Sequence, residues 1–177
     1  MRINLPHPNK FAKIWEEVTG VALNKTVRGI VTDSREVRPG DLYIAISGDR
    51  VDGHTFIKDV FEKGAVCALV NSEIENADEQ LIKVNNSVST IGKVAKAWRN
   101  QFDIPVMGIT GSNGKTSTKE LLKHMLSAQF NIHATEGNFN TSIGLPLTLL
   151  RLTKENTMSL LEMGANQPGD IAQLCEI

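Results

Sequence analysis

The most informative segment of the chain reads Pro105-Val106-Met107-Gly108-Ile109-Thr110-Gly111-Ser112-Asn113-Gly114-Lys115-Thr116-Ser117. Residues 105–110 are apolar and rich in strand formers, whereas residues 116–130 repeat apolar side chains at the spacing of a helix. The side chains expected to face inward from this helix are Leu121, Leu122, Met125 and Leu126. A strand, a glycine-rich turn and a helix in this order are the local context of a phosphate-binding loop.

The glycines of this turn suit an anion site. Gly111 and Gly114 allow a sharp turn in which successive backbone N–H groups point inward, and the following helix adds its positive N-terminal end. Lys115 would reach the β- and γ-phosphates of a nucleotide, and the Thr116 hydroxyl would ligate Mg²⁺. The strict GxxxxGK[ST] pattern requires glycine where this chain has Ile109. The alternative is a glycine-rich turn with an exposed lysine.

A second candidate follows another apolar run. Glu162 ends the segment Met158-Ser159-Leu160-Leu161. Ligands of parallel sheets bind at the carboxyl ends of the strands, and Mg²⁺ prefers carboxylate oxygen. Glu162 is therefore a candidate metal ligand, with an exposed glutamate at a strand end as the alternative.

The periodicity outside these segments predicts two units. Residues 11–18 and 56–61 have helical spacing, and the segments 27–31, 42–46, 66–70 and 81–84 have strand composition. A helix on 87–102 and strands at 131–135 and 157–162 then extend the alternation of strand and helix. We predict an α/β chain, with a small α/β domain at residues 1–85 and the first part of a parallel-sheet, phosphate-loop domain at residues 86–177.

Composition excludes several classes of protein. Of 177 residues, 41% are hydrophobic and 22% charged, which is typical of a globular chain rather than a disordered one. The net charge is −1 and neither half is basic, so no nucleic-acid partner is expected. The longest apolar run, 65–70, is too short for membrane insertion. The two cysteines form no disulfide or metal pattern, so we expect a cytoplasmic protein, with Cys67 and Cys175 facing the core.

Three segments together resemble the Mur ligases, which are ATP-dependent amide-forming enzymes of peptidoglycan precursor synthesis. The loop reads GSNGKTS at 111–117, and it is similar to the ATP loop of that family. Two further segments are similar to the family member that adds D-Ala-D-Ala: GNFNTSIGLPLTLL at 137–150 and EMGANQPGDI at 162–171. In the first unit, Asp33-Ser34-Arg35, PGDL at 39–42 and DGHTFI at 52–57 resemble the family's UDP-sugar-binding domain.

This resemblance implies a two-step reaction. ATP would phosphorylate the terminal carboxylate of UDP-MurNAc-tripeptide to an acyl phosphate, and D-Ala-D-Ala would displace the phosphate to form an amide. The implied catalytic residues are Lys115, Glu162, Asn138 and Asn140, and the implied Mg²⁺ ligands are Thr116 and Glu162. The implied nucleotide-binding residues are Gly111, Ser112, Asn113, Gly114, Lys115, Thr116 and Ser117, and those beside the uridine diphosphate are Asp33, Ser34 and Arg35.

The resemblance also implies that the chain is the N-terminal portion of a longer enzyme, which would be monomeric in full, and that this portion is inactive alone. Two related activities stay open: the sibling ligase that adds the third amino acid, and a folylpolyglutamate-type ligase. A third alternative belongs to another class, a non-catalytic module that binds the UDP-peptide.

Overall fold

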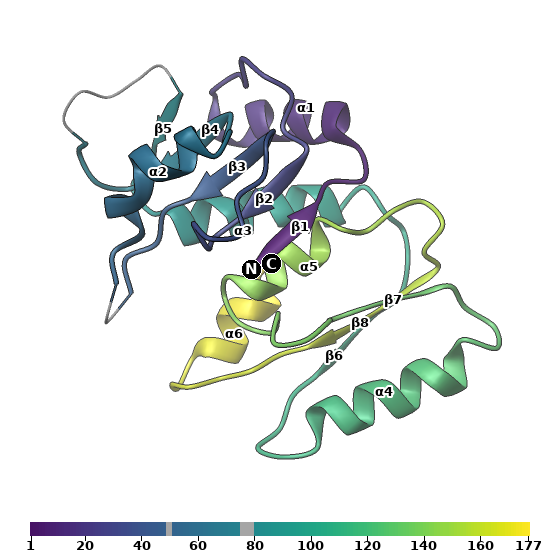
Figure 1. Cartoon of the computed structure of the whole chain (residues 1–177). Coiled ribbons are helices and arrows are strands. Elements are labelled where there is room, and N and C mark those ends of the chain that lie inside the picture. The colour runs from purple at the N-terminus through teal and green to yellow at the C-terminus, as the bar shows by residue number, and fades with distance from the viewer. Residues whose placement is uncertain (49–50, 75–79) are drawn as a thin grey trace. The chain divides into compact units, whose positions relative to one another are not determined.

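The computed structural model describes residues 1–48, 51–74 and 80–177. The chain divides into two compact units, Met1–Val94 and Ala95–Ile177. The division falls within helix α3 (Ser87–Arg99), nine residues after the domain boundary expected from the sequence. Each unit is described separately below (Figure 1).

The first unit is built on a five-stranded sheet in the order β1-β2-β3-β4-β5. Strands β2 to β5 are parallel, and β1 is antiparallel to β2. The strands are β1 (Arg2–Asn4), β2 (Gly29–Val31), β3 (Asp41–Ile44), β4 (Cys67–Val70) and β5 (Leu81–Lys83). The helical segments are α1 (Pro8–Thr19), η1 (Gly53–Phe56) and α2 (Ile57–Glu62). The alternation predicted from the sequence is therefore present, and the α/β fold class is confirmed.

Both faces of this sheet are buried, which explains why its strands are almost continuously apolar. On one face, Val31, Tyr43 and Ala68 pack with Ile57 and Val60 of α2. The side chains that alternate with them along the strands are also fully buried: Ile30, Leu42, Ile44 and Leu69. Cys67 is buried, as expected.

Strand β1 was not predicted because three residues give no readable period. An ion pair fixes it instead. The Arg2 guanidinium donates two hydrogen bonds to the Asp41 carboxylate, 2.8 Å from Nε to Oδ2 and 2.9 Å from Nη2 to Oδ1. The pair passes over Gly29 of β2, where an added Cβ would lie 2.5 Å from Asp41 Oδ1. Only glycine leaves room for this link between β1 and β3.

The second unit contains a parallel three-stranded sheet in the order β6-β8-β7. The strands are β6 (Val106–Ile109), β7 (Ile132–Ala134) and β8 (Met158–Glu162). The helices after α3 are α4 (Lys115–Leu126), α5 (Gly144–Leu149) and α6 (Asp170–Cys175). Helix α4 lies against the sheet (Figure 1). The predicted parallel sheet is confirmed.

The predicted inward face of α4 is partly wrong. Leu122 and Leu126 pack against the cluster formed by Ala134, Met158 and Leu160 of the sheet. Leu121 and Met125, however, are exposed by 61% and 62%. The buried face of α4 instead includes Lys119, whose exposed fraction is 2%. The prediction for Cys175 is also wrong, because it is exposed on α6 beside the buried Leu174.

No helix in the described part of the chain is long and apolar enough to cross a membrane.

Candidate functional site

The carboxyl ends of the three parallel strands in the second unit bring the predicted loop and Glu162 to one edge. Ile109 of β6 pairs with Glu162 of β8, and the Met163 N–H donates to the Ile109 carbonyl at 2.8 Å. The loop at 111–114 leaves β6 directly after this pair. Ala134 of β7 pairs with Leu160. Ligands of parallel sheets bind at such an edge.

The loop has the backbone that its glycines predict. Gly111 has φ = 149° and Gly114 has φ = 76°, which side chains other than glycine rarely adopt. Helix α4 begins at Lys115, so the loop ends at a helix N-terminus with free backbone N–H groups. The Lys115 ammonium donates to the Gly111 carbonyl at 2.7 Å, and its side chain therefore lies over the loop.

Glu162 is the centre of the site. Its side chain is buried, with an exposed fraction of 3%, so it is not an exposed glutamate at a strand end. Each carboxylate oxygen accepts one hydrogen bond. The Thr116 hydroxyl donates to Oε2 at 2.9 Å, and the Asn140 amide donates to Oε1 at 2.9 Å. These three side chains, from α4, β8 and the loop after β7, form what we call the Glu162 cluster.

The Glu162 cluster fits Mg²⁺. Because the Thr116 hydroxyl donates its hydrogen bond to the carboxylate, its oxygen lone pairs stay available for a cation. Mg²⁺ usually takes one or two protein oxygen ligands and completes its shell with water and phosphate oxygens. Within residues 1–48, 51–74 and 80–177, no group of three or more His, Cys, Asp or Glu could hold a metal ion by itself. A magnesium ion at this edge would therefore depend on bound phosphate, as in phosphate-loop enzymes.

The loop that carries Asn138 and Asn140 is held in place by contacts with α5. The Thr148 hydroxyl donates to the Phe139 carbonyl at 3.2 Å. A Cβ on Gly144 would lie 2.4 Å from Phe139 Cα, so glycine is required for this backbone contact. The Asn140 carbonyl accepts from the Gly164 N–H at 2.8 Å. Asn140 is thus fixed toward Glu162, whereas Asn138 is exposed on the same loop.

A buried histidine supports α5. The two ring nitrogens of His133 lie 2.9 Å from Ser159 Oγ and 2.9 Å from the Thr148 carbonyl. Because a carbonyl only accepts, Nε2 carries the proton and Nδ1 accepts from the Ser159 hydroxyl. Burial lowers the pKa of His133 to about 4. The neutral ring therefore joins β7, β8 and α5.

We expect the stability of the second unit to fall in mild acid because of His133. The unfolded chain binds a proton at pKa 6.5 and the folded chain only at about 4. The stabilisation is therefore complete above pH 6.5 and is lost as the pH falls toward 4, by on the order of 3 kcal/mol. Urea unfolding of the wild type and of His133→Gln across this range measures the loss, since the variant lacks the titrating ring. Equal pH dependence in both proteins would contradict the assignment.

In the first unit, Asp33, Ser34 and Arg35 follow the carboxyl end of β2. Asp33 accepts from the Arg35 backbone N–H at 3.0 Å and from its guanidinium at 2.9 and 2.6 Å. These bonds hold the pKa of Asp33 well below its usual range. Ser34 is buried, and the Lys63 ammonium donates to its carbonyl at 2.9 Å. These hydrogen bonds hold the turn, and the Arg35 side chain is exposed while paired with Asp33.

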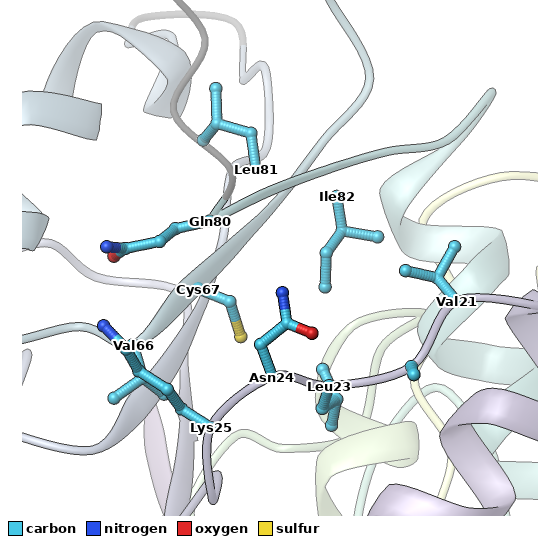
Figure 2. Close-up of a pocket in the computed structure, with 10 residues that line it drawn as sticks. Val21, Leu23, Asn24, Lys25, Val66, Cys67, Gln80, Leu81 and Ile82 are labelled. Carbon is cyan, nitrogen blue, oxygen red and sulfur yellow. The ribbon is translucent and has the colours of Figure 1, made fainter.

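A pocket of about 240 Å³ lies at the other end of this sheet, beside the amino ends of β4 and β5 (Figure 2). Figure 2 shows Cys67 in its wall, with Asn24 and Ile82 nearby. Burial raises the pKa of the Cys67 thiol to about 12, so the thiol stays protonated and is a poor nucleophile. None of the site residues predicted from the sequence lines this pocket.

Comparison with known families agrees with this arrangement. The model of the Mur ligase family, catalytic domain, matches residues 26–99, and that of the Mur ligase middle domain matches residues 109–177. Together they span most of the chain. The chain belongs to the Mur ligase family.

Curated relatives of this Mur ligase chain are named UDP-N-acetylmuramoyl-tripeptide--D-alanyl-D-alanine ligase. The relative from Bacillus subtilis (strain 168) is 37% identical over 93% of this chain and 37% of its own length. The relative from Escherichia coli (strain K12) is 40% identical over 83% of this chain and 32% of its own length. The chain thus spans about a third of the length of the curated relatives it matches.

Solved structures of the same kind resemble this Mur ligase chain in fold. MurF from Acinetobacter baumannii matches with a TM-score of 0.84 at 32% identity, over 92% of this chain and 37% of the other. MurF ligase from Thermotoga maritima, solved with ADP, matches with a TM-score of 0.76 at 41% identity, over 83% of this chain and 34% of the other. The resemblance to Mur ligases found in the sequence is therefore confirmed.

The structure of this Mur ligase chain also brings in two residues that the sequence did not single out. Lys119 and Thr135 lie behind the Glu162 cluster and are both buried. Lys119, Leu122 and Leu126 are spaced i, i+3 and i+7, so they share one face of the helix. A lysine on an otherwise apolar face was the sequence pattern that could have pointed to Lys119. Thr135 follows directly after β7, and no pattern distinguishes it from other residues at strand ends.

Proposed function

We propose that this chain belongs to an ATP-dependent ligase that adds D-Ala-D-Ala to UDP-MurNAc-tripeptide in peptidoglycan precursor synthesis, working in the cytoplasm. The observation that carries the proposal is the Glu162 cluster beside the glycine loop, because it provides one buried carboxylate and one hydroxyl next to a site for phosphates. The names of the curated relatives support the choice of substrates.

The proposed first step forms an acyl phosphate. An oxygen of the tripeptide's terminal carboxylate attacks the γ-phosphorus of ATP, the bond to the β–γ bridging oxygen breaks, and ADP leaves. Phosphoryl transfer needs mainly positioning and stabilisation of charge. The backbone N–H groups at 111–114, the α4 N-terminus and the Lys115 ammonium would hold the phosphates. Thr116 and Glu162 would hold Mg²⁺, which neutralises phosphate charge when bound.

The proposed second step forms the amide. The amino group of D-Ala-D-Ala attacks the acyl carbon, inorganic phosphate leaves, and the nitrogen loses a proton. Asn138 and Asn140 lie on the loop beside Glu162, in a position suited to the γ-phosphate and the reacting carboxylate. Asp33, Ser34 and Arg35 would contact the uridine diphosphate in the first unit, where the Arg35 guanidinium is available to a phosphate.

Substrate preference tests the proposal. In the full-length ligase, we expect ADP release and a product of the mass of UDP-MurNAc-pentapeptide only when UDP-MurNAc-tripeptide and D-Ala-D-Ala are both present. The parallel reactions contain UDP-MurNAc-dipeptide with meso-diaminopimelate or lysine, and a reduced folate with glutamate. Turnover in one of these instead would replace the proposed substrates. Binding of UDP-sugar without any ATP turnover would favour a non-catalytic module.

A further inference from the structure

Lys119 is a buried cation that the proposed reaction does not use. Its side chain has an exposed fraction of 2%, although it stands only one turn after Lys115 on α4. Its ammonium donates to the Thr135 carbonyl at 2.6 Å. It also lies 2.9 Å from Glu120 Oε1, on a side chain that is 59% exposed.

Stability alone does not account for this lysine. Removing an ammonium group from water costs several kcal/mol, and a salt bridge often fails to repay that cost. Leu122 and Leu126 on the same stripe pack against the sheet without any such cost. An apolar side chain at position 119 would extend that stripe. What an apolar residue could not supply is the hydrogen bond to the Thr135 carbonyl.

The contact with Thr135 leads to the Glu162 cluster. Thr135 has an exposed fraction of 1%, and three of its atoms are engaged. Its N–H donates to the Leu160 carbonyl at 3.0 Å, and its carbonyl accepts from Lys119. Its hydroxyl oxygen accepts from the Glu162 N–H at 2.9 Å. Lys119 thus fixes the residue that holds the backbone of Glu162.

Thr135 also begins the loop at 135–143, which carries Asn140. Lys119 on α4 therefore fixes the start of a loop whose Asn140 amide donates to Glu162 Oε1. The other donor to Glu162, Thr116, is on α4 as well. One helix thus contacts the carboxylate directly through Thr116 and indirectly through Lys119.

We propose that Lys119 is a positioning residue for the Glu162 cluster and acts through Thr135. The inference rests on the proposed function and deepens it, because the cluster is the proposed Mg²⁺ site. Lys119 holds the end of β7 so that the Glu162 carboxylate keeps one oxygen on Thr116 and the other on Asn140. Groups that orient metal ligands in this way commonly change metal affinity or activity by about 10- to 100-fold when they are removed.

The test uses Lys119→Met in the full-length ligase, because methionine keeps an unbranched apolar side chain, one atom shorter than that of lysine, but has no donor. We expect the Mg²⁺ concentration for half-maximal ADP release to rise about 10-fold and kcat to fall about 10-fold. The KM for the UDP substrate should stay within about 2-fold, because the substrate-binding turn belongs to the other unit. The matched control is Lys123→Met, one turn further along α4, which should keep wild-type values.

A second variant tests the route through Thr135. Thr135→Val removes the hydroxyl that accepts from Glu162 and keeps the carbonyl that accepts from Lys119. We expect it to raise the Mg²⁺ requirement as Lys119→Met does, and the double variant should exceed the stronger single variant by no more than about 2-fold. Fully multiplicative effects would overturn the route through Thr135.

Two further measurements keep the proposal falsifiable. If Lys119→Met does not fold, Lys119→Arg, which retains a cationic donor, should stay folded with a Mg²⁺ requirement nearer the wild type than that of Thr135→Val. A folded Lys119→Met protein with a lowered Tm and unchanged Mg²⁺ dependence would reduce Lys119 to a structural role. Mg²⁺-dependent binding of ADP, measured by calorimetry, separates the two proposals: a change there without any D-Ala-D-Ala ligation by the wild type would remove the proposed function and leave the role of Lys119 standing.

Discussion

Replacing Lys115 with alanine is expected to lower kcat for ATP-dependent ligation by about 100- to 1,000-fold in the full-length enzyme. The side chain lies over the loop, with its ammonium 2.7 Å from the Gly111 carbonyl, so it is placed to contact phosphates that the loop's N–H groups would bind. Its charge is needed most when the transferring phosphoryl group develops charge. Steady-state ADP release measures the effect.

The specificity of that effect can be checked in two ways. Equilibrium binding of the UDP substrate should change by less than about 2-fold, because Asp33, Ser34 and Arg35 belong to the other unit. The control is Lys123→Ala, which removes a lysine from the last turn of the same helix. Activity of Lys115→Ala within a few-fold of the wild type would refute the role given to this lysine.

The second large effect is expected for Glu162→Gln. Glutamine has nearly the same shape and can still accept from the Thr116 hydroxyl, so the fold should be kept. It lacks the negative charge, however. Its NH₂ group would also face the Asn140 NH₂ group unless one of the two side-chain amides rotates by 180°. We expect the Mg²⁺ concentration for half-maximal activity to rise about 10-fold or more, with a loss of kcat of similar size.

Magnesium titrations of ADP release measure this change. The matched control is Glu136→Gln, which replaces an exposed carboxylate near the start of the loop that carries Asn140; Glu136 pairs with Arg151 at 2.6 Å. Its Mg²⁺ dependence should equal that of the wild type. An unchanged Mg²⁺ dependence in Glu162→Gln would show that the carboxylate holds no metal.

The sequence predicted the parts of this chain that are set by local patterns. The glycine loop could be recognised because Gly111 and Gly114 stand between a strand and a helix, and both adopt left-handed backbone. The family resemblance was readable from the same residues together with the segments at 137–150 and 162–171. The roles of the predicted site residues, those of the loop and Glu162 as well as those of Asn138, Asn140 and the Asp33 turn, remain predictions.

Other features of the fold depend on contacts between residues distant in the sequence, and these cannot be predicted from local periodicity. Strand β1 is held by an ion pair from Arg2 to Asp41. The wrong inward face of α4 has the same origin. Four apolar residues in six positions suggested a broad stripe, but the buried side is set by Lys119, whose partner Thr135 is 16 residues away. Because lysines are usually exposed, the sequence pattern placed Lys119 in solvent. The predicted buried face therefore included Leu121 and Met125, which are exposed.

The backbone contact between Gly144 and Phe139 separates two roles within one short loop. Residue 139 is held by main-chain packing against Gly144 and by the Thr148 hydroxyl. The side chain of residue 138 takes no part in these two contacts. Residue 138 projects into solvent just before this anchor. Substitutions at the exposed position 138 should therefore leave the carboxylate at 162 in place, so the proposed contribution of Asn138 can be measured separately from that of Glu162.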